Sequence, residues 1–205
     1  FRAFRAAGNE TGIEFAKLLA NSGELSFELG DFADAIRKQR RVVAIEDALP
    51  FVTSQDRAYT LNRLALALAR TDALAEARAL FQEAIRLTCA APERSPKQLV
   101  EIWNNLSAAE RRSGHLDAAR QHANEALTLA ARELAPEELV WAGLWNNLGM
   151  IALAGNNLQA AKDYYEKSAA VALRISGRES PRYAAALSNL ATVETKQAHH
   201  GRARA

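Results

Sequence analysis

Residues 145–165 read WNNLGMIALAGNNLQAAKDYY and hold one clear copy of a pattern that repeats along the chain. In this copy a large residue, Leu148, is followed by a small one, Gly149, and residues of the same kinds return every 42 positions. The column at Leu148 contains Ser22, Leu64, Leu106, Leu148 and Leu190, and the column after it contains Gly23, Ala65, Ser107, Gly149 and Ala191. A third column is alanine throughout: Ala35, Ala77, Ala119, Ala161 and Ala203. A period between about 20 and 50 residues indicates that one supersecondary unit has been copied and stacked.

The spacing of apolar residues inside each copy predicts two helices. Offsets of three, four and seven define one face of a helix, and Trp145, Leu148 and Ala152 meet them. A second stripe consists of Leu158, Ala161, Tyr165 and Ala169. Small residues at the crossing of the two stripes let the backbones approach, while bulky neighbours fill the remaining space. Each copy is therefore expected to be a helical hairpin.

Residues that end and begin helices stand at matching places in the copies. The positions between the two helices are Gly30, Asp72, Gly114, Asn156 and Ala198. The first four are residue types that tolerate the left-handed conformation that closes a helix. Helix starts are predicted at Pro96, Pro136 and Pro181, with Ser95 and Ser180 as caps, and at Asp31, Asp117 and Asn157. Because no long segment alternates apolar and polar residues as a strand does, the chain is predicted to be all-α.

The composition describes an ordinary folded chain of 205 residues, with 49% hydrophobic and 24% charged residues. The sequence contains no apolar run long enough to span a membrane and no signal peptide, which predicts a soluble, cytoplasmic protein without a membrane partner. Its single cysteine, Cys89, excludes an intramolecular disulfide. A nucleic-acid partner is not expected, because 26 basic residues are balanced by 24 acidic ones. No phosphate loop, metal-ligand spacing or nucleophile motif is found, so neither catalysis nor a metal or other cofactor is predicted.

The repeat resembles the tetratricopeptide repeat, whose consensus is matched by Trp145, Leu148, Gly149, Leu158, Ala161 and Tyr165. Its period is longer than the usual one of about 34 residues. The segment 177–190, together with the Asn-Asn-Leu sequences at 104–106 and 146–148, is similar to the longer variant found in kinesin light chains and many bacterial regulators.

The resemblance implies a right-handed α-solenoid of about five helix-turn-helix repeats in a single domain. The expected repeats are about 10–50, 53–92, 96–134, 137–176 and 181–205, the last being incomplete. The chain begins at Phe1 and ends inside the fifth repeat, which suggests part of a longer protein. One interpretation assigns Phe1, Phe4, Ile13 and Phe15 to an earlier helix that caps the stack.

For function, the resemblance implies a non-catalytic module that binds a peptide or protein segment in a concave groove lined by the first helices. In that family an asparagine just before the leucine column often holds a peptide backbone, and this role carries over to Asn105, Asn147 and Asn189. Arg63 takes the equivalent place in the second repeat. A carboxamide can pair with both N–H and C=O groups of a peptide. The alternative is that these asparagines bond only between neighbouring helices.

Basic residues are expected to face the same groove: Arg63, Arg70, Arg111, Arg112 and Lys196. Because arginine pairs bidentately with carboxylates, they favour an acidic peptide or a free C-terminus; the alternative is an ordinary solvated face. A second hypothesis is a sensor or regulatory domain of a larger bacterial signalling or transcription-regulatory protein. Self-association through an exposed terminal repeat is also expected to be possible.

Overall fold

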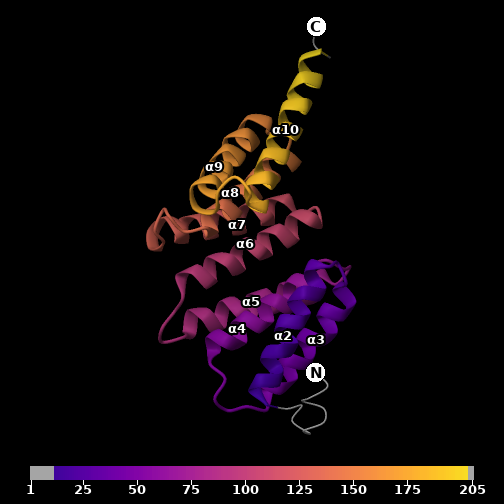
Figure 1. The fold of residues 1–205 in the computed structure, drawn as a ribbon, viewed down its shortest axis with the longest axis vertical. Helices are drawn as coiled ribbons and strands as arrows, with labels where there is room; N and C mark the ends of the chain where they lie inside the picture. Colours follow the sequence, from indigo (N-terminus) through magenta and orange to yellow (C-terminus); the bar gives the residue numbers. More distant parts are fainter. Residues whose placement is uncertain (1–11, 203–205) are drawn as a thin grey trace. The chain divides into compact units, whose positions relative to one another are not determined.

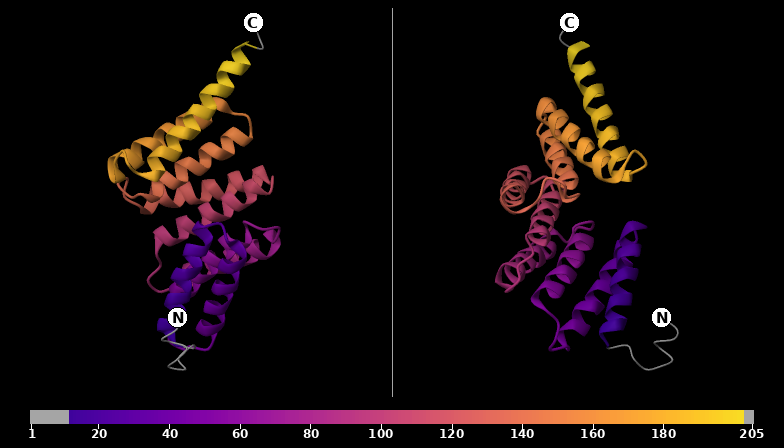
Figure 2. Two further views of the ribbon diagram at one scale, coloured as in Figure 1. Left: turned by 45° about the vertical axis from the view of Figure 1, so that its right-hand side comes forward. Right: turned by 60° about the vertical axis from the view of Figure 1, so that its left-hand side comes forward.

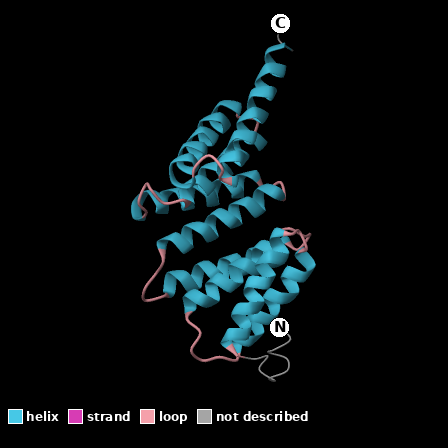
Figure 3. Ribbon diagram, in the orientation of Figure 1, coloured by secondary structure: helices cyan, strands magenta, loops and turns pink. Residues whose placement is uncertain are grey.

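The computed structural model describes residues 12–202, with side chains up to residue 198, and α-helix is the only regular secondary structure in this part of the chain. Figure 3 shows helices joined by short loops, with no strand among the described residues. The helices are α2 (Ile13–Glu28), α3 (Phe32–Asp47), α4 (Ser54–Leu68), α5 (Leu74–Ala90), α6 (Pro96–Arg112), α7 (Leu116–Glu133), α8 (Val140–Ala154), α9 (Leu158–Ser176) and α10 (Pro181–Arg202). The prediction of an all-α helical-repeat fold is confirmed. Phe1 and Phe4 lie outside the described residues, whereas Ile13 and Phe15 belong to α2 itself, not to an earlier helix.

The chain divides between Ile102 and Trp103 into two compact units. Unit 1 contains α2 to α5 and the first turns of α6, and unit 2 contains the rest of α6 together with α7 to α10.

Unit 1 consists of two helical hairpins, α2–α3 and α4–α5, with α3 also packed on α4 (Figure 1). Its first hairpin encloses a buried cluster of Phe15, Ala16, Leu19, Val42 and Ile45. Two of its helices, α3 and α4, begin with side-chain caps. The Asp31 carboxylate accepts a hydrogen bond from the Asp34 N–H at 3.0 Å, and the Thr53 hydroxyl accepts one from the Asp56 N–H at 3.1 Å. These caps satisfy backbone donors that have no partner inside the helix.

Unit 2 contains the α8–α9 hairpin, with α10 packed on α9 and α7 packed on α8. Tyr165 of α9 is fully buried beside Ala161 and Val193. The C-terminal end of α10 projects beyond α8 and α9 (Figures 1 and 2). The turn predicted at Ala198 is wrong, because α10 continues through this residue to Arg202. Alanine favours the helix and, unlike glycine or asparagine, resists the left-handed conformation that would end it.

Three of the four predicted left-handed turns are confirmed. Gly30 and Gly114 have φ of 82°, and Asn156 has φ of 57°. Asp72 is not in this conformation, and the α4–α5 loop instead turns through a hydrogen bond from the Thr71 N–H to the Leu68 carbonyl at 2.9 Å.

The predicted helix starts are confirmed at Pro96 and Pro181 and wrong at Pro136. Ser95 and Ser180 each accept a backbone N–H at 3.3 Å, as expected of caps. After Pro136 the chain first makes a turn, in which the Glu138 N–H donates to the Ala135 carbonyl at 3.2 Å, and α8 begins only at Val140. Of the residues expected to open second helices, Asp31 and Asn157 are side-chain caps, but α7 has His115 at the cap position and Asp117 in its first turn.

Candidate functional site

Arg63 lies on α4, half-buried, and is held by groups on two helices of unit 1. Its guanidinium donates to the Tyr59 hydroxyl at 2.8 Å and lies 4.9 Å from the centre of the Tyr59 ring. It also forms an ion pair with Glu24 of α2. Glu24 therefore balances the charge of Arg63, and this part of the surface has no excess of positive charge. A cavity beside the pair, lined in part by Gly23 and Gln39, holds only about 10 Å³, which is room for one water molecule.

Arg70 follows the C-terminal end of α4 and covers an aromatic pair in unit 1. Its guanidinium carbon is 4.8 Å from the Phe32 ring centre and 5.7 Å from that of Phe27. The two rings meet edge to face, 5.5 Å apart. Arg70 is exposed, so its charge remains available to solvent while its plane stabilises the rings.

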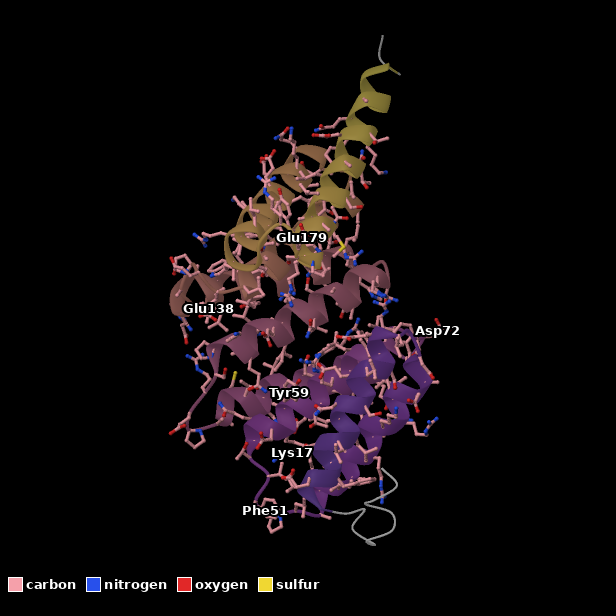
Figure 4. All side chains as sticks on the ribbon, viewed as in Figure 1. Lys17, Phe51, Tyr59, Asp72, Glu138 and Glu179 are labelled. Atoms are coloured by element: carbon pink, nitrogen blue, oxygen red, sulfur yellow. The ribbon has the colours of Figure 1, made fainter. Side chains whose placement is uncertain are left out.

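A cavity of about 550 Å³ in unit 1 is bounded by α2, α3, α4 and the α3–α4 loop. We call it the Glu46 cavity. Glu46 is only 8% exposed; its Oε1 accepts the Thr60 hydroxyl at 2.7 Å and its Oε2 lies 3.4 Å from an Arg57 nitrogen. Burial raises the pKa of Glu46, and the Thr60 and Arg57 contacts oppose this rise. Phe51 and Tyr59, which are 63% and 42% exposed, stand at the rim with Lys17 on the same side of unit 1 (Figure 4).

A second cavity of about 360 Å³ lies between α4 and the first turns of α6 and is called the Gln98 cavity. The Gln98 side chain donates to the Gln55 carbonyl at 3.0 Å and so connects α6 with α4. Asp56 and Tyr59 line both cavities. The two cavities thus adjoin along the first helices of successive hairpins.

Sequence reasoning missed both cavities, although one signal was present. Glu46 follows Val42 by four residues, on the stripe of α3 that is otherwise buried. A carboxylate on an apolar stripe marks either an internal ion pair or a site. The rim residue Phe51 could not be placed in the same way, because it belongs to a loop without periodicity.

In unit 2, Asn147 is 2% exposed and joins helices to one another. Its amide nitrogen donates to Oδ1 of Asn104 at 3.1 Å and to the Ser107 hydroxyl at 3.0 Å, and that hydroxyl donates to the Ala119 carbonyl at 2.7 Å. The half-buried Asn189 repeats the pairing with Oδ1 of Asn146 at 2.8 Å. These bonds match the alternative in which the asparagines connect neighbouring helices. Contact of Asn147, Asn189 or the half-buried Asn105 with a peptide backbone stays a prediction.

The predicted basic residues of unit 2 differ in exposure. Arg112 and Lys196 are exposed, whereas Arg111 is half-buried. Burial lowers the pKa of Arg111, and the nearby Tyr165 opposes this change. Neither Nε of Arg111 nor the hydroxyl of Tyr165 has a hydrogen-bond partner in the described part of the chain.

No group of three or more His, Cys, Asp or Glu side chains in the described part of the chain is arranged to hold a metal ion. No described helix is both long enough and apolar enough to cross a membrane.

Comparison with known proteins identifies the family. Profiles of the tetratricopeptide repeat match residues 57–91 and residues 142–205, which include the α4–α5 and α8–α9 hairpins. The chain is a tetratricopeptide-repeat protein. The predicted family is thereby confirmed. No curated protein matches the chain.

Solved structures share this fold at low sequence identity. A Rap protein complexed with Competence and Sporulation Factor matches with a TM-score of 0.77 and 14% identity, over 92% of this chain and 50% of that one. The Rap conjugation gene regulator of the plasmid pLS20, in complex with the Phr* peptide, matches with a TM-score of 0.66 and 14% identity, over 91% of this chain and 55% of that one. TPR-like repeats of a Podosopora anserina kinesin light chain match with a TM-score of 0.66 and 17% identity, over 92% and 89%. The chain spans about half the length of the two Rap proteins.

Proposed function

We propose that this protein is a non-catalytic interaction module that binds an extended peptide or protein segment along the first helices of its hairpins. The observation that carries the proposal is the adjoining pair of cavities in unit 1, which share Asp56 and Tyr59. An extended segment presents side chains at regular intervals, and two neighbouring cavities on successive hairpins suit such a ligand. Rigid packed helices reduce the ordering cost of binding. The similarity to a Rap regulator in complex with the Phr* peptide supports a peptide as the ligand class.

In unit 2 we propose that the basic residues Arg111, Arg112 and Lys196 contact acidic side chains or a C-terminal carboxylate of the partner. The exposed positions of Arg112 and Lys196 support this role. Asn105 and Asn189 are only half-buried, so their amides are the more reachable ones for a peptide backbone. In unit 1 we propose that Arg63 and Arg70 border the binding surface, with Arg63 holding Tyr59 in place. We further propose that the repeats of both units belong to one binding domain.

The test is selection from a random dodecapeptide library displayed on phage, followed by anisotropy titration of the enriched peptides. Tyr59→Ala removes the aromatic residue shared by both cavities and is expected to weaken binding about tenfold, as loss of a central aromatic contact does. Leu25→Ala is the matched control, because Leu25 is 56% exposed on α2 and lines neither cavity. Circular dichroism checks that both variants are folded. If no peptide is enriched, or if the two variants bind alike, the proposal is wrong.

A second candidate function is a sensor or regulatory domain of a larger bacterial, cytoplasmic signalling protein. It is favoured by the similarity to a structure described as a conjugation gene regulator. In that case an enriched peptide should change the activity of an output domain in the full-length protein. If the peptide binds without such an effect, the regulatory hypothesis is wrong and the interaction module remains.

Self-association through a terminal repeat is also proposed. Leu187 of α10 and Leu173 and Ile175 of α9 are each between 37% and 44% exposed, which leaves apolar surface at this end of unit 2. Sedimentation equilibrium of the protein and of a Leu187→Glu variant tests this point. We expect the wild type to associate and the variant to do so less. A monomeric wild type would contradict the proposal.

A further inference from the structure

The Glu46 cavity has a wall that suits the stem of a long side chain and acidic groups that suit a positive head. Ala16 and Val42, each 2% exposed, form part of its apolar wall, and Glu46 and Asp56 contribute carboxylates. We propose that this cavity receives a basic side chain, arginine or lysine, of the bound segment. The inference rests on the proposed function and specifies the chemistry of one of its two cavities in unit 1.

The charges that line the cavity are Lys17, Glu46 and Asp56. The Lys17 ammonium already pairs with Glu14 at 2.9 Å, so the positive charge at the rim is balanced. Asp56 accepts the Thr53 hydroxyl at 2.7 Å and has no ion-pair partner in the described part of the chain. The cavity thus has an uncompensated negative charge, which favours a cation and disfavours a ligand carboxylate.

Arg57 compensates Glu46 only in part. Its guanidinium donates to Asp47 at 2.6 Å and to the Val43 carbonyl at 2.8 Å, and its distance to Glu46 is the longest of the three, at 3.4 Å. Arg57 does not line the cavity. Among the described residues, the Glu46 carboxylate therefore has only the Thr60 hydroxyl and the distant Arg57 guanidinium as side-chain partners. A positively charged donor that entered the cavity would add a further hydrogen bond and compensate the buried charge.

The aromatic rim fits the same ligand. Phe51 is 63% exposed on a loop, and a large aromatic residue in such a position is typical of a contact surface. The Tyr59 ring already carries a guanidinium, that of Arg63, at 4.9 Å. Arginine and lysine have apolar stems and charged heads, so they pack against apolar and aromatic walls while the head reaches carboxylates. A short acidic side chain would use neither feature.

The experiment compares three pools of acetylated, amidated octapeptides whose fixed central residue is arginine, citrulline or glutamate, with all other positions randomised. Citrulline has nearly the shape of arginine without its charge, so the pair isolates the charge. Anisotropy titrations against the whole protein are expected to give binding about tenfold tighter for the arginine pool than for the citrulline pool, in keeping with a charge pair at a partly buried site. Glu46→Gln, which keeps an oxygen to accept the Thr60 hydroxyl, should bring the two pools to nearly equal affinity. Glu28→Gln is the matched control, because Glu28 is exposed on α2 and lies outside the cavity.

The possible results distinguish failure of the proposed function from failure of this inference alone. If no pool binds, the proposed function fails and this inference fails with it. If the pools bind but arginine has no advantage, or if the advantage survives Glu46→Gln, only the inference is overturned and peptide binding stands. Preference for the glutamate pool overturns it as well. Binding that appears only after removal of residues 1–11 would assign the cavity to the chain's own N-terminal segment and would also overturn it.

Discussion

The first hairpin of unit 1 and the α8–α9 hairpin of unit 2 use the same small residue at their crossing and fill the space beside it differently. In unit 2 the ring of Tyr165 is fully buried against Gly149, and a Cβ atom on that glycine would lie 2.5 Å from a ring carbon. In unit 1 the equivalent Gly23 faces Gln39, whose flexible end would lie 3.0 Å from such an atom. A repeated glycine is thus a strict requirement in one unit and a looser one in the other.

The intervening hairpins carry other pairs of residues at the equivalent positions of the 42-residue period. At the positions equivalent to Gly149 and Tyr165 they have Ala65 with Phe81 and Ser107 with Ala123, and all four residues are fully buried. The bulkier side chain of Ser107 thus coincides with the smallest partner, whereas Gly149 coincides with the largest.

The largest effect that would separate the two crossings is expected from adding a methyl group to each glycine. Gly149→Ala should lower the free energy of unfolding of unit 2 by about 1–2 kcal/mol, because overpacking against a rigid ring exceeds the gain in helix propensity. Gly23→Ala should change unit 1 by less than about 0.5 kcal/mol or stabilise it, because the end of Gln39 can move. Urea unfolding followed by tryptophan fluorescence reports on unit 2, since Trp103, Trp141 and Trp145 all lie there, and circular dichroism reports on both units. Equal losses in the two variants would show that the crossings are equivalent.

The sequence predicted these crossings because they depend on local periodicity. The 42-residue period placed Gly149 and Tyr165 on facing stripes, and residue type alone identified the left-handed turn at Asn156. The site was harder to predict. Whether the amide of Asn147 faces solvent or a neighbouring helix depends on the register between α6 and α8. The periodicity within one repeat does not determine this register. The Glu46 cavity depends on the path of the α3–α4 loop, which carries no repeated pattern.

A smaller effect on the free energy of unfolding is expected from placing an apolar residue at the first crossing, that of Gly23 and Gln39. Gln39 is 3% exposed and its Oε1 has no hydrogen-bond partner in the described part of the chain, while its nitrogen makes one long bond of 3.3 Å to the Ala20 carbonyl. Gln39→Leu keeps the approximate volume and removes the unpaired acceptor, so we expect unit 1 to gain about 1 kcal/mol. Tyr165→Leu, the matched change in unit 2, should instead destabilise by leaving a gap beside Gly149. Amide hydrogen exchange of α2 and α3 measures the first effect locally. A loss of protection in Gln39→Leu would mean that the amide is needed to hold the crossing.

The smallest effect at neutral pH is expected from Tyr165→Phe, and it becomes visible in alkali. The hydroxyl has no hydrogen-bond partner among the described residues, so its removal should change the stability of unit 2 by less than about 1 kcal/mol near pH 7. Burial raises the pKa of Tyr165 to about 12, against the opposing influence of Arg111, whereas an unfolded tyrosine titrates near 10. Between about pH 10 and pH 12 the unfolded chain therefore loses this proton while the folded one keeps it, and the stability of unit 2 falls as pH rises. Tyr165→Phe lacks this contribution, and its urea midpoint should fall less than that of the wild type between pH 9 and pH 11. The remaining tyrosines are common to both proteins and serve as an internal control. If the urea midpoints of the two proteins stayed parallel over this range, Tyr165 would ionise as easily in the folded chain as in the unfolded one. The crossing at Tyr165 would then exclude water no better than the crossing at Gln39.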